Sequence, residues 1–342
     1  MKRNIYKILT LLAIPLIMAG CRKDLCYDHY DASNPNSISL DIEWLLEWEL
    51  GSEFNWAANW ENLGADNDYE YFRPKQPEGI AVILYDEIDE EHTYNRELHL
   101  PASGGSITLD ETTRALLIHN DDSEFIIISE TKNPDNAYAS TRSVSRSAFD
   151  DFHAGEKTMT EPDNLYGAFV EIEGINSEEG VRSAPRISLR PLVYSYVLRF
   201  KIDKNRACIA GARGAIAGLP DRIFLKDATT GTGSATILFD GSVTSYGIGT
   251  HIVTFGAHNP RNDSDYDDSS RKRYDLKLEI LFYNGNSLSY EFDITDQIEK
   301  QPQGGVIILE DLDIPDEIAR NGSGFQPNVD EWGDENDVTL PL

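Results

Sequence analysis

Cys21 stands directly after a segment with the features of an export signal. The chain starts with three basic residues, Lys2, Arg3 and Lys7, and continues as an apolar run over Ile8–Met18. This order is typical of a secretory signal peptide. The run is too short to cross a bilayer as a helix, which needs about 20 apolar residues. We therefore expect residues 1–20 to be a signal peptide that is removed on export.

The residues at the end of this run indicate what happens to the cysteine. Met18-Ala19-Gly20-Cys21 places small residues immediately before a thiol and resembles the bacterial lipobox. The resemblance implies cleavage between Gly20 and Cys21 and acylation of Cys21, with palmitate-type chains that anchor the protein in a membrane. The alternative is an ordinary signal peptide followed by an incidental cysteine.

Two further cysteines, Cys26 and Cys208, remain after Cys21 is assigned to lipid. An exported protein meets conditions that permit disulfides. The two could pair and tie the N-terminal segment to the second half of the chain. A single pair has no diagnostic spacing, so two unpaired thiols are the alternative.

Aromatic residues gather between positions 44 and 60. Trp56 and Trp60 lie in a polar segment, where their rings could stack on sugar rings and bind carbohydrate. The simpler interpretation is that both rings cover the edge of a sheet. We favour the second interpretation and retain carbohydrate as an alternative ligand.

Other patterns that could support catalysis or metal binding are incomplete. The seven histidines are scattered singly, and we interpret His119 as a structural residue. Four aspartates, Asp263, Asp265, Asp267 and Asp268, resemble the start of a calcium loop, but the turn glycine is missing and Tyr274 stands at the bidentate position. No phosphate-binding loop or nucleophile motif stands out. We expect no catalytic residue, no metal site, no cofactor and no enzymatic activity.

The charge excludes one class of partner. The full chain carries a formal net charge of −29, and removing residues 1–20 takes away three basic residues and no acidic ones, which leaves −32. So acidic a surface repels the phosphate backbone of nucleic acids. We therefore expect a protein that does not bind nucleic acid.

The elements that carry these residues are predicted to be strands. Residues 37–44 alternate polar and apolar side chains, which is typical of a half-buried strand. Val193–Ile202 alternates in the same way. Every second residue from Tyr194 to Ile202 is apolar, and we expect these side chains on the core side. Asn284-Gly285 predicts a hairpin between strands over residues 274–283 and 288–294. Many short strands and frequent turns favour an all-β protein with two successive β-sandwiches.

We expect four parts along the chain. The signal peptide (1–20) is followed by a lipidated tether (21–36), an N-terminal β-sandwich domain (37–184) and a C-terminal β-sandwich domain with an acidic tail (185–342). The segment 131–162, rich in polar and small residues, is expected to be a long excursion within the first domain.

Several motifs together resemble a known family. They are Cys21–His29 at the mature start, Asp163–Gly167, Arg190–Tyr194, Gly214–Leu219, and Gly324-Phe325 with Trp332–Asp334 near the end. The chain resembles the fimbrillin superfamily of Bacteroides-type bacteria, in particular the lipoproteins related to type V pilus anchor and accessory subunits. The resemblance implies two tandem transthyretin-like β-sandwich domains and display as an outer-membrane lipoprotein at the cell surface.

The same resemblance implies a mode of binding. Stalk subunits of that superfamily lose their lipidated segment to an arginine-specific protease, and a strand from the next subunit fills the groove. Here no Arg or Lys occurs between Lys23 and Arg73, and Arg73 precedes Pro74, which makes a poor cleavage site. We therefore expect an uncleaved pilus anchor or accessory subunit with a role in cell adhesion, which binds fimbrillin-type subunits by β-strand addition, with residues 37–44 as the nominated strand. A surface module that binds carbohydrate or another host ligand is the alternative, and an adhesin at a pilus tip is not distinguished.

Overall fold

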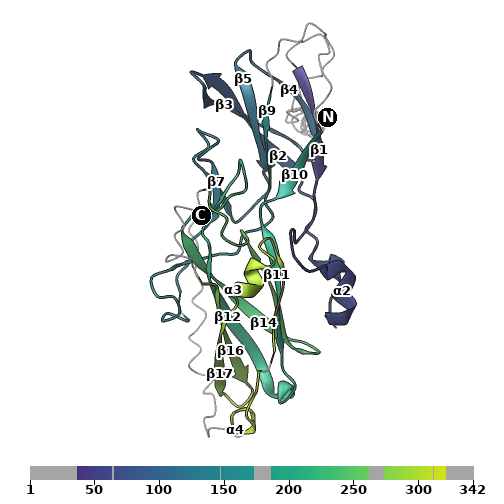
Figure 1. The fold of residues 1–342 in the computed structure, drawn as a ribbon, viewed down its shortest axis with the longest axis vertical. Coiled ribbons are helices and arrows are strands. Elements are labelled where there is room, and N and C mark those ends of the chain that lie inside the picture. The colour runs from purple at the N-terminus through teal and green to yellow at the C-terminus, as the bar shows by residue number, and fades with distance from the viewer. Residues whose placement is uncertain are drawn as a thin grey trace, which may run out of the picture.

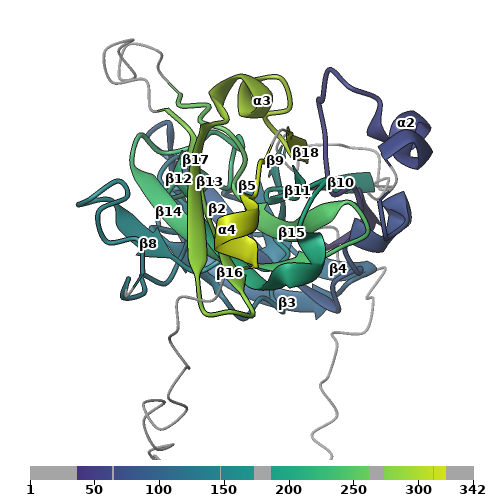
Figure 2. The ribbon, with the colours of Figure 1, turned by 90° about the horizontal axis from the view of Figure 1, so that it is seen from below.

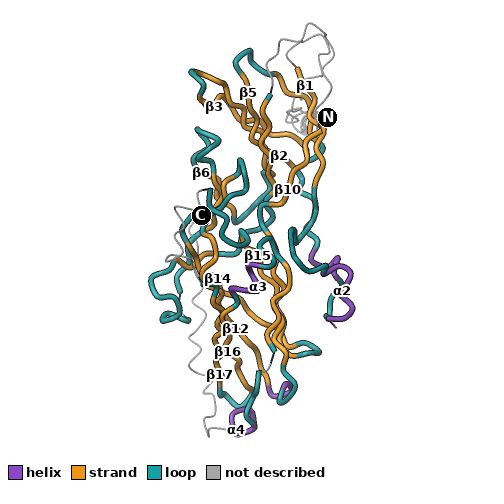
Figure 3. The backbone as a smooth tube through the Cα atoms, in the orientation of Figure 1, coloured by secondary structure: helices purple, strands orange, loops and turns teal. Residues whose placement is uncertain are grey.

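A computed structural model describes residues 37–63, 65–146, 148–172, 186–261, 273–310 and 312–320. Strands dominate these residues, and two large sheets follow each other along the long axis of the molecule (Figures 1 and 3). The all-β class and the two successive β-sandwich units are thus confirmed. None of the described helices is long and apolar enough to cross a membrane.

The first sheet has seven strands in the order β3-β2-β5-β9-β10-β1-β4. Their bounds are Ser37–Trp44 (β1), Gly79–Ile88 (β2), Glu91–Pro101 (β3), Gly104–Thr108 (β4), Thr113–Asn120 (β5), Tyr166–Glu171 (β9) and Arg186–Pro191 (β10). The two end strands, β3 and β4, are consecutive in the chain and are separated by Ala102 and Ser103. The sheet therefore curls until its ends meet. Its concave side holds a core in which Leu40, Leu84 and Leu189 are buried.

The second sheet has the order β17-β16-β12-β14-β15-β11-β18. Its strands are Tyr194–Lys201 (β11), Ile209–Pro220 (β12), Ser234–Val243 (β14), Gly247–Thr254 (β15), Asp275–Phe282 (β16), Ser287–Asp293 (β17) and Gly305–Leu309 (β18), and Lys157–Met159 (β8) pairs with β14. β14 pairs with β12 up to Gly241 and with β15 from Ser242 onward. This change of partner folds the sheet into two layers around the larger core.

A third, small sheet connects the two halves. It contains Ile126–Ser129 (β6), Tyr138–Thr141 (β7) and Ile223–Phe224 (β13), in the order β13-β7-β6. Ala139 and Ile223 pack with Ile83 and Leu117 on the convex side of the first sheet. Because β13 comes from the second half of the chain, this core joins the two halves.

Short helices complete the structure. They are Trp56–Leu63 (α2), Tyr69–Phe72 (η1), Arg206–Cys208 (η2), Thr295–Glu299 (α3) and Asp316–Ala319 (α4). In the view from below, α4 lies at the near end of the molecule and α2 at its side (Figure 2).

Local predictions of strands agree with the structure. Ile38, Leu40 and Ile42 of β1 are buried, as the alternation predicts, and so are the apolar residues on the predicted core side of β11. The hairpin at Asn284-Gly285 joins β16 to β17, and Gly285 has φ +83°, as such a turn requires. The opposite side of β11 is also buried, at Val197 and Arg199, because the segment that connects β1 to β2 covers it.

Two expectations about the organisation change. The segment 131–162 does not stay within the first domain, because β7 pairs with β13 and β8 pairs with β14. The expected domain boundary at residues 184 and 185 lies outside the described residues, and β10, which follows it, pairs with β1 and β9 of the first sheet. We therefore propose that the boundary lies after β10, at residues 192–193.

Candidate functional site

The residues predicted to carry the lipid are not among those that the structure describes. Gly20, Cys21 and Cys26 lie outside the described residues, as do the aspartates of the calcium-like loop, Asp263 to Asp268. Lipid attachment, signal cleavage and the Cys26–Cys208 pair therefore stay predictions. Cys208 itself is half-buried at the end of η2, directly before β12.

Trp56 and Trp60 are buried side chains of a segment that we call the strap, residues 45–63 and 65–78, which runs from β1 to β2. Trp56 is 8 % exposed and Trp60 is 7 % exposed. They form a small core with Trp48 of the strap and with Val197 and Val306 on the outer side of β11 and β18. Neither ring offers a free face for stacking on a sugar.

Hydrogen bonds hold the strap in place. The amide N–H of Ser195 donates to the carbonyl of Trp48 over 2.9 Å, and that of Leu50 donates to the carbonyl of Gln303 over 2.7 Å. The ring of Phe72 lies 5.3 Å from that of His251, whose pKa is lowered by burial. The strap is thus an integral layer of the second sandwich, although it follows a strand of the first.

The ionisable side chains of the described residues lie in pairs and small groups. Among the described residues, no group of three or more His, Cys, Asp or Glu side chains could hold a metal ion. His119 is 7 % exposed, and burial lowers its pKa. His153 lies between Glu156 and Asp275, at 3.2 and 2.9 Å, and joins the segment that precedes β8 to β16. These arrangements have structural roles.

A protein that binds by strand addition needs a sheet edge whose main-chain groups are unpaired. β1, nominated from the sequence, does not offer one, because β10 and β4 occupy its two sides. The ends of the first sheet, β3 and β4, face each other, and the guanidinium of Arg96 on β3 donates to the carbonyl of Thr108 on β4. Neither strand of this curled sheet is left as a simple open edge.

The outer edge of β18 is occupied by two glutamines of the segment around α3. The amide of Gln301 accepts a hydrogen bond from the N–H of Val306 (3.0 Å) and donates to its carbonyl (2.7 Å). Gln297 bonds Ile308 in the same way, over 2.9 and 3.0 Å. The two side-chain amides therefore occupy the positions that a neighbouring strand would take.

β17 is different. It stands at the other end of the second sheet, and β16 is its one ladder partner among the residues that the structure describes. It is seven residues long, and its register with β16 has no bulge. Natural edge strands are often protected by proline, by charged side chains, lysine above all, or by a bulge. β17 has no proline, lysine or bulge, and its charged residues are Glu291 and Asp293.

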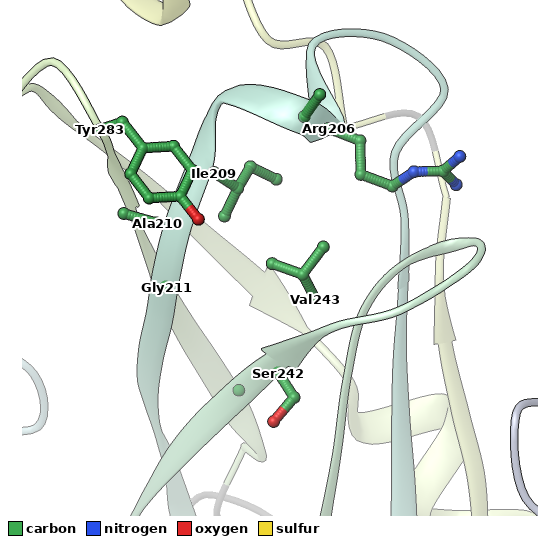
Figure 4. Close-up of a pocket in the computed structure, with 9 residues that line it drawn as sticks. Arg206, Ile209, Ala210, Gly211, Ser242, Val243 and Tyr283 are labelled. Atoms are coloured by element: carbon green, nitrogen blue, oxygen red, sulfur yellow. The ribbon is translucent and has the colours of Figure 1, made fainter.

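A hollow lies near the turn that leads into β17 (Figure 4). It has a volume of about 500 Å³, and its lining includes Arg206, Ile209, Val243 and Tyr283. It forms because the β12–β14 ladder ends at Ala212 and Gly241, after which β14 turns to β15. Val243 and Tyr283 are exposed, so this end of the molecule carries apolar surface.

Sequence reasoning missed the strand order and the glutamines. The Asn284-Gly285 turn predicts that β16 pairs with β17, but no local pattern shows whether another strand lies beyond β17. Gln297 and Gln301 are four residues apart, which is the spacing of neighbours on one face of a helix, although α3 ends at Glu299. That spacing is a weak signal, because their partners in β18 lie five or more residues further along the chain.

Comparison with known proteins identifies a family that the chain matches and a relative of similar length. The family model described as a domain of unknown function (DUF5119) matches residues 62–240. The chain is 22 % identical, over the whole length of both proteins, to a candidate fimbrium anchoring subunit, Fim4B, of Bacteroides ovatus. This relative confirms the resemblance to fimbrial anchor proteins.

Solved structures show a similar fold. A candidate adhesin from Bacteroides ovatus has a TM-score of 0.53 and 19 % sequence identity, with 86 % of this chain and 98 % of that chain covered. The fimbrial anchor protein Mfa2 from Porphyromonas gingivalis has a TM-score of 0.39 and 11 % identity, with 80 % of this chain and 90 % of that chain covered. The first of these shows that the fold is shared.

Proposed function

This chain belongs to the DUF5119 family of domains of unknown function, and from that premise we propose that it is a lipid-anchored fimbrial anchor or accessory subunit at the cell surface. It binds partner subunits by accepting a β-strand and catalyses no reaction. The full-length similarity to a protein named as a candidate fimbrium anchoring subunit supports this role. The lipobox-like Met18–Cys21 supports attachment to the outer membrane.

One observation carries the proposal: the start of β1 and the edge strand β17 lie toward opposite ends of the molecule. β1, which follows the tether, starts at the upper end in Figure 1, and β17 lies in the lower part. An anchor must hold the membrane with one end and present the other to its partner. The arrangement of the two sheets satisfies this requirement.

The position of β1 supports an uncleaved subunit. β1 lies between β10 and β4, and Leu40 on this strand is 2 % exposed. Removing β1 would expose the core of the first sheet. A subunit that keeps this strand also keeps the covalent link to Cys21.

A carbohydrate-binding module is the alternative class, and no observation favours it. The two tryptophans nominated for sugar stacking, Trp56 and Trp60, are buried against the second sheet. Their indole N–H groups are also satisfied inside the protein, by Gln301 and by the carbonyl of Asn67.

The test compares the native protein with a Cys21→Ser variant in the organism that makes it. We expect the wild-type chain in the outer-membrane fraction, with fimbrial subunits that copurify after detergent extraction. The variant should leave the membrane fraction and release fimbriae into the medium. Wild-type protein that is membrane-bound but free of fimbrial subunits would overturn the pilus role.

A further inference from the structure

We propose that β17 is the edge at which this protein accepts a partner strand, and that the accepted strand alternates apolar and basic residues. This inference rests on the proposed function and specifies the site and the chemistry of the partner.

The main-chain groups of β17 divide between its two sides. The N–H of Phe282 donates to the carbonyl of Asn286, and the N–H of Ile294 donates to that of Tyr274, both over 2.9 Å. Antiparallel pairs alternate between hydrogen-bonded and non-hydrogen-bonded. Between these two ends, the register therefore directs the main-chain groups of Leu288, Tyr290 and Phe292 toward β16.

The four intervening residues direct their main-chain groups away from β16. They are Ser287, Ser289, Glu291 and Asp293, and all four are exposed. At about 3.4 Å per residue, they form an edge roughly 20 Å long. An extended strand is the ligand class whose main-chain groups match such an edge.

The core side of β17 indicates apolar residues in the partner. Leu288, Tyr290 and Phe292 are half-buried and pack against the core of the second sandwich, and the Tyr290 hydroxyl donates to the carbonyl of Asp313 over 2.6 Å. The rings of Tyr290 and Phe292 are stacked, with centroids 6.0 Å apart. A strand added beside β17 would place every second side chain next to these residues and extend the core.

The outer side indicates basic residues. Glu291 and Asp293 point there. They pair with Lys277 (2.6 Å) and Arg273 (3.1 Å), and their side chains are still 62 % and 49 % exposed. Opposite charges across a strand pair are favourable, and like charges are not. A second copy of this chain would bring two more carboxylates and another large negative charge, which disfavours pairing of β17 with itself.

The test uses the full mature chain in detergent and synthetic nine-residue peptides as probes. We expect binding of a peptide that alternates valine and lysine, measured by fluorescence anisotropy. Hydrogen exchange at the amides of Ser289 and Glu291 should slow when it binds. A peptide that alternates valine and glutamate, and a valine–lysine peptide with N-methyl groups on alternate amides, should bind at least about tenfold more weakly.

Ser289→Pro is the diagnostic variant, because it removes an outward N–H and leaves the ladder with β16 intact. It should weaken peptide binding about tenfold, whereas the matched control Ser289→Thr should change it by less than about twofold. Glu291→Gln keeps the main chain and should reduce the preference for lysine over glutamate. Equal binding to wild type and Ser289→Pro, with both folded as judged by thermal unfolding, would overturn the inference.

In the native envelope, copurification distinguishes the acceptor role of β17 from the anchor function. Ser289→Pro should keep its lipid and lose fimbrial subunits, while Ser289→Thr should retain both. If Ser289→Pro still copurifies with fimbrial subunits, β17 is not the acceptor, and the anchor function stands. If the wild-type protein itself copurifies with none, the anchor function fails, and peptide binding alone then decides whether β17 accepts strands.

Discussion

Gln301 is 1 % exposed, and its side-chain amide makes three hydrogen bonds. It bonds both main-chain groups of Val306 and accepts from the indole N–H of Trp56 over 3.0 Å. The same residue therefore protects the edge of β18 and holds the strap. A buried polar group that loses its partner costs about 1–3 kcal/mol.

We predict that Gln301→Leu lowers the free energy of unfolding by about 3 kcal/mol, because it leaves three buried partners unsatisfied. Gln297→Leu is the matched control, since Gln297 is half-buried and bonds Ile308 alone; its loss should be about 1 kcal/mol. Urea unfolding measures both. Equal effects for the two variants would show that the contact with Trp56 and the deeper burial of Gln301 do not contribute.

Two buried histidines predict how stability changes with pH. Burial lowers the pKa of His119 and of His251 below the ordinary value of 6.5. Below pH 6.5 the unfolded chain therefore binds more protons at these sites than the folded one, so their contribution to stability falls as pH falls. Burial raises the pKa of Glu49 and Glu161, which contributes with the opposite sign at lower pH.

Comparison with a variant isolates the histidine contribution. We predict that the stability of wild type, relative to that of His251→Gln, decreases between pH 6.5 and pH 5.5. The measurement is urea unfolding at several pH values. A difference that does not change with pH would mean that His251 titrates alike in the folded and unfolded states.

At the scale of the element, the sequence predicts individual strands well and their pairing poorly. The alternation in β1 and β11 and the Asn-Gly turn between β16 and β17 depend on neighbouring residues, so they can be read locally. The parallel pairs β1–β10 and β11–β18 join strands more than 100 residues apart. The strap packs on β11 through Trp56 and Trp60. The sequence pattern around these two residues does not show whether their rings are buried against a sheet or form an exposed aromatic surface.

Substitution by alanine is expected to lower stability by different amounts at two glycines, Gly285 and Gly247. A Cβ at Gly285 (φ +83°) would meet nothing within 4 Å, so Gly285→Ala should cost about 1 kcal/mol through backbone strain alone. A Cβ at Gly247 (φ +153°) would lie 2.1 Å from the carbonyl oxygen of Phe200. Gly247→Ala should cost about 3 kcal/mol or more, because β15 must shift on β11. Thermal unfolding of both variants tests the order, and similar losses would contradict this account of the β11–β15 contact.

At the scale of the whole molecule, the distance between its two ends limits how the cysteines can pair. At about 3.3 Å per residue, the two eight-residue strands β1 and β11, which follow each other along the long axis, span roughly 50 Å, and Cys208 lies seven residues after the end of β11. The eleven residues from Cys26 to Ser37 reach at most about 40 Å. We therefore predict that Cys26 and Cys208 do not pair within one chain. Peptide mapping without reduction checks this, and a Cys26–Cys208 peptide from monomeric protein would contradict it.

The central claim is that this subunit keeps its lipid and its first strand while it holds a fimbrial partner. Mass spectrometry of the chain isolated from intact fimbriae, read at both termini, tests it most directly. We expect an N-terminus at Cys21 that carries acyl chains, in a complex with fimbrial subunits. A chain that begins after an internal arginine, such as Arg73 or Arg142, would contradict it and indicate a stalk subunit that polymerises after cleavage.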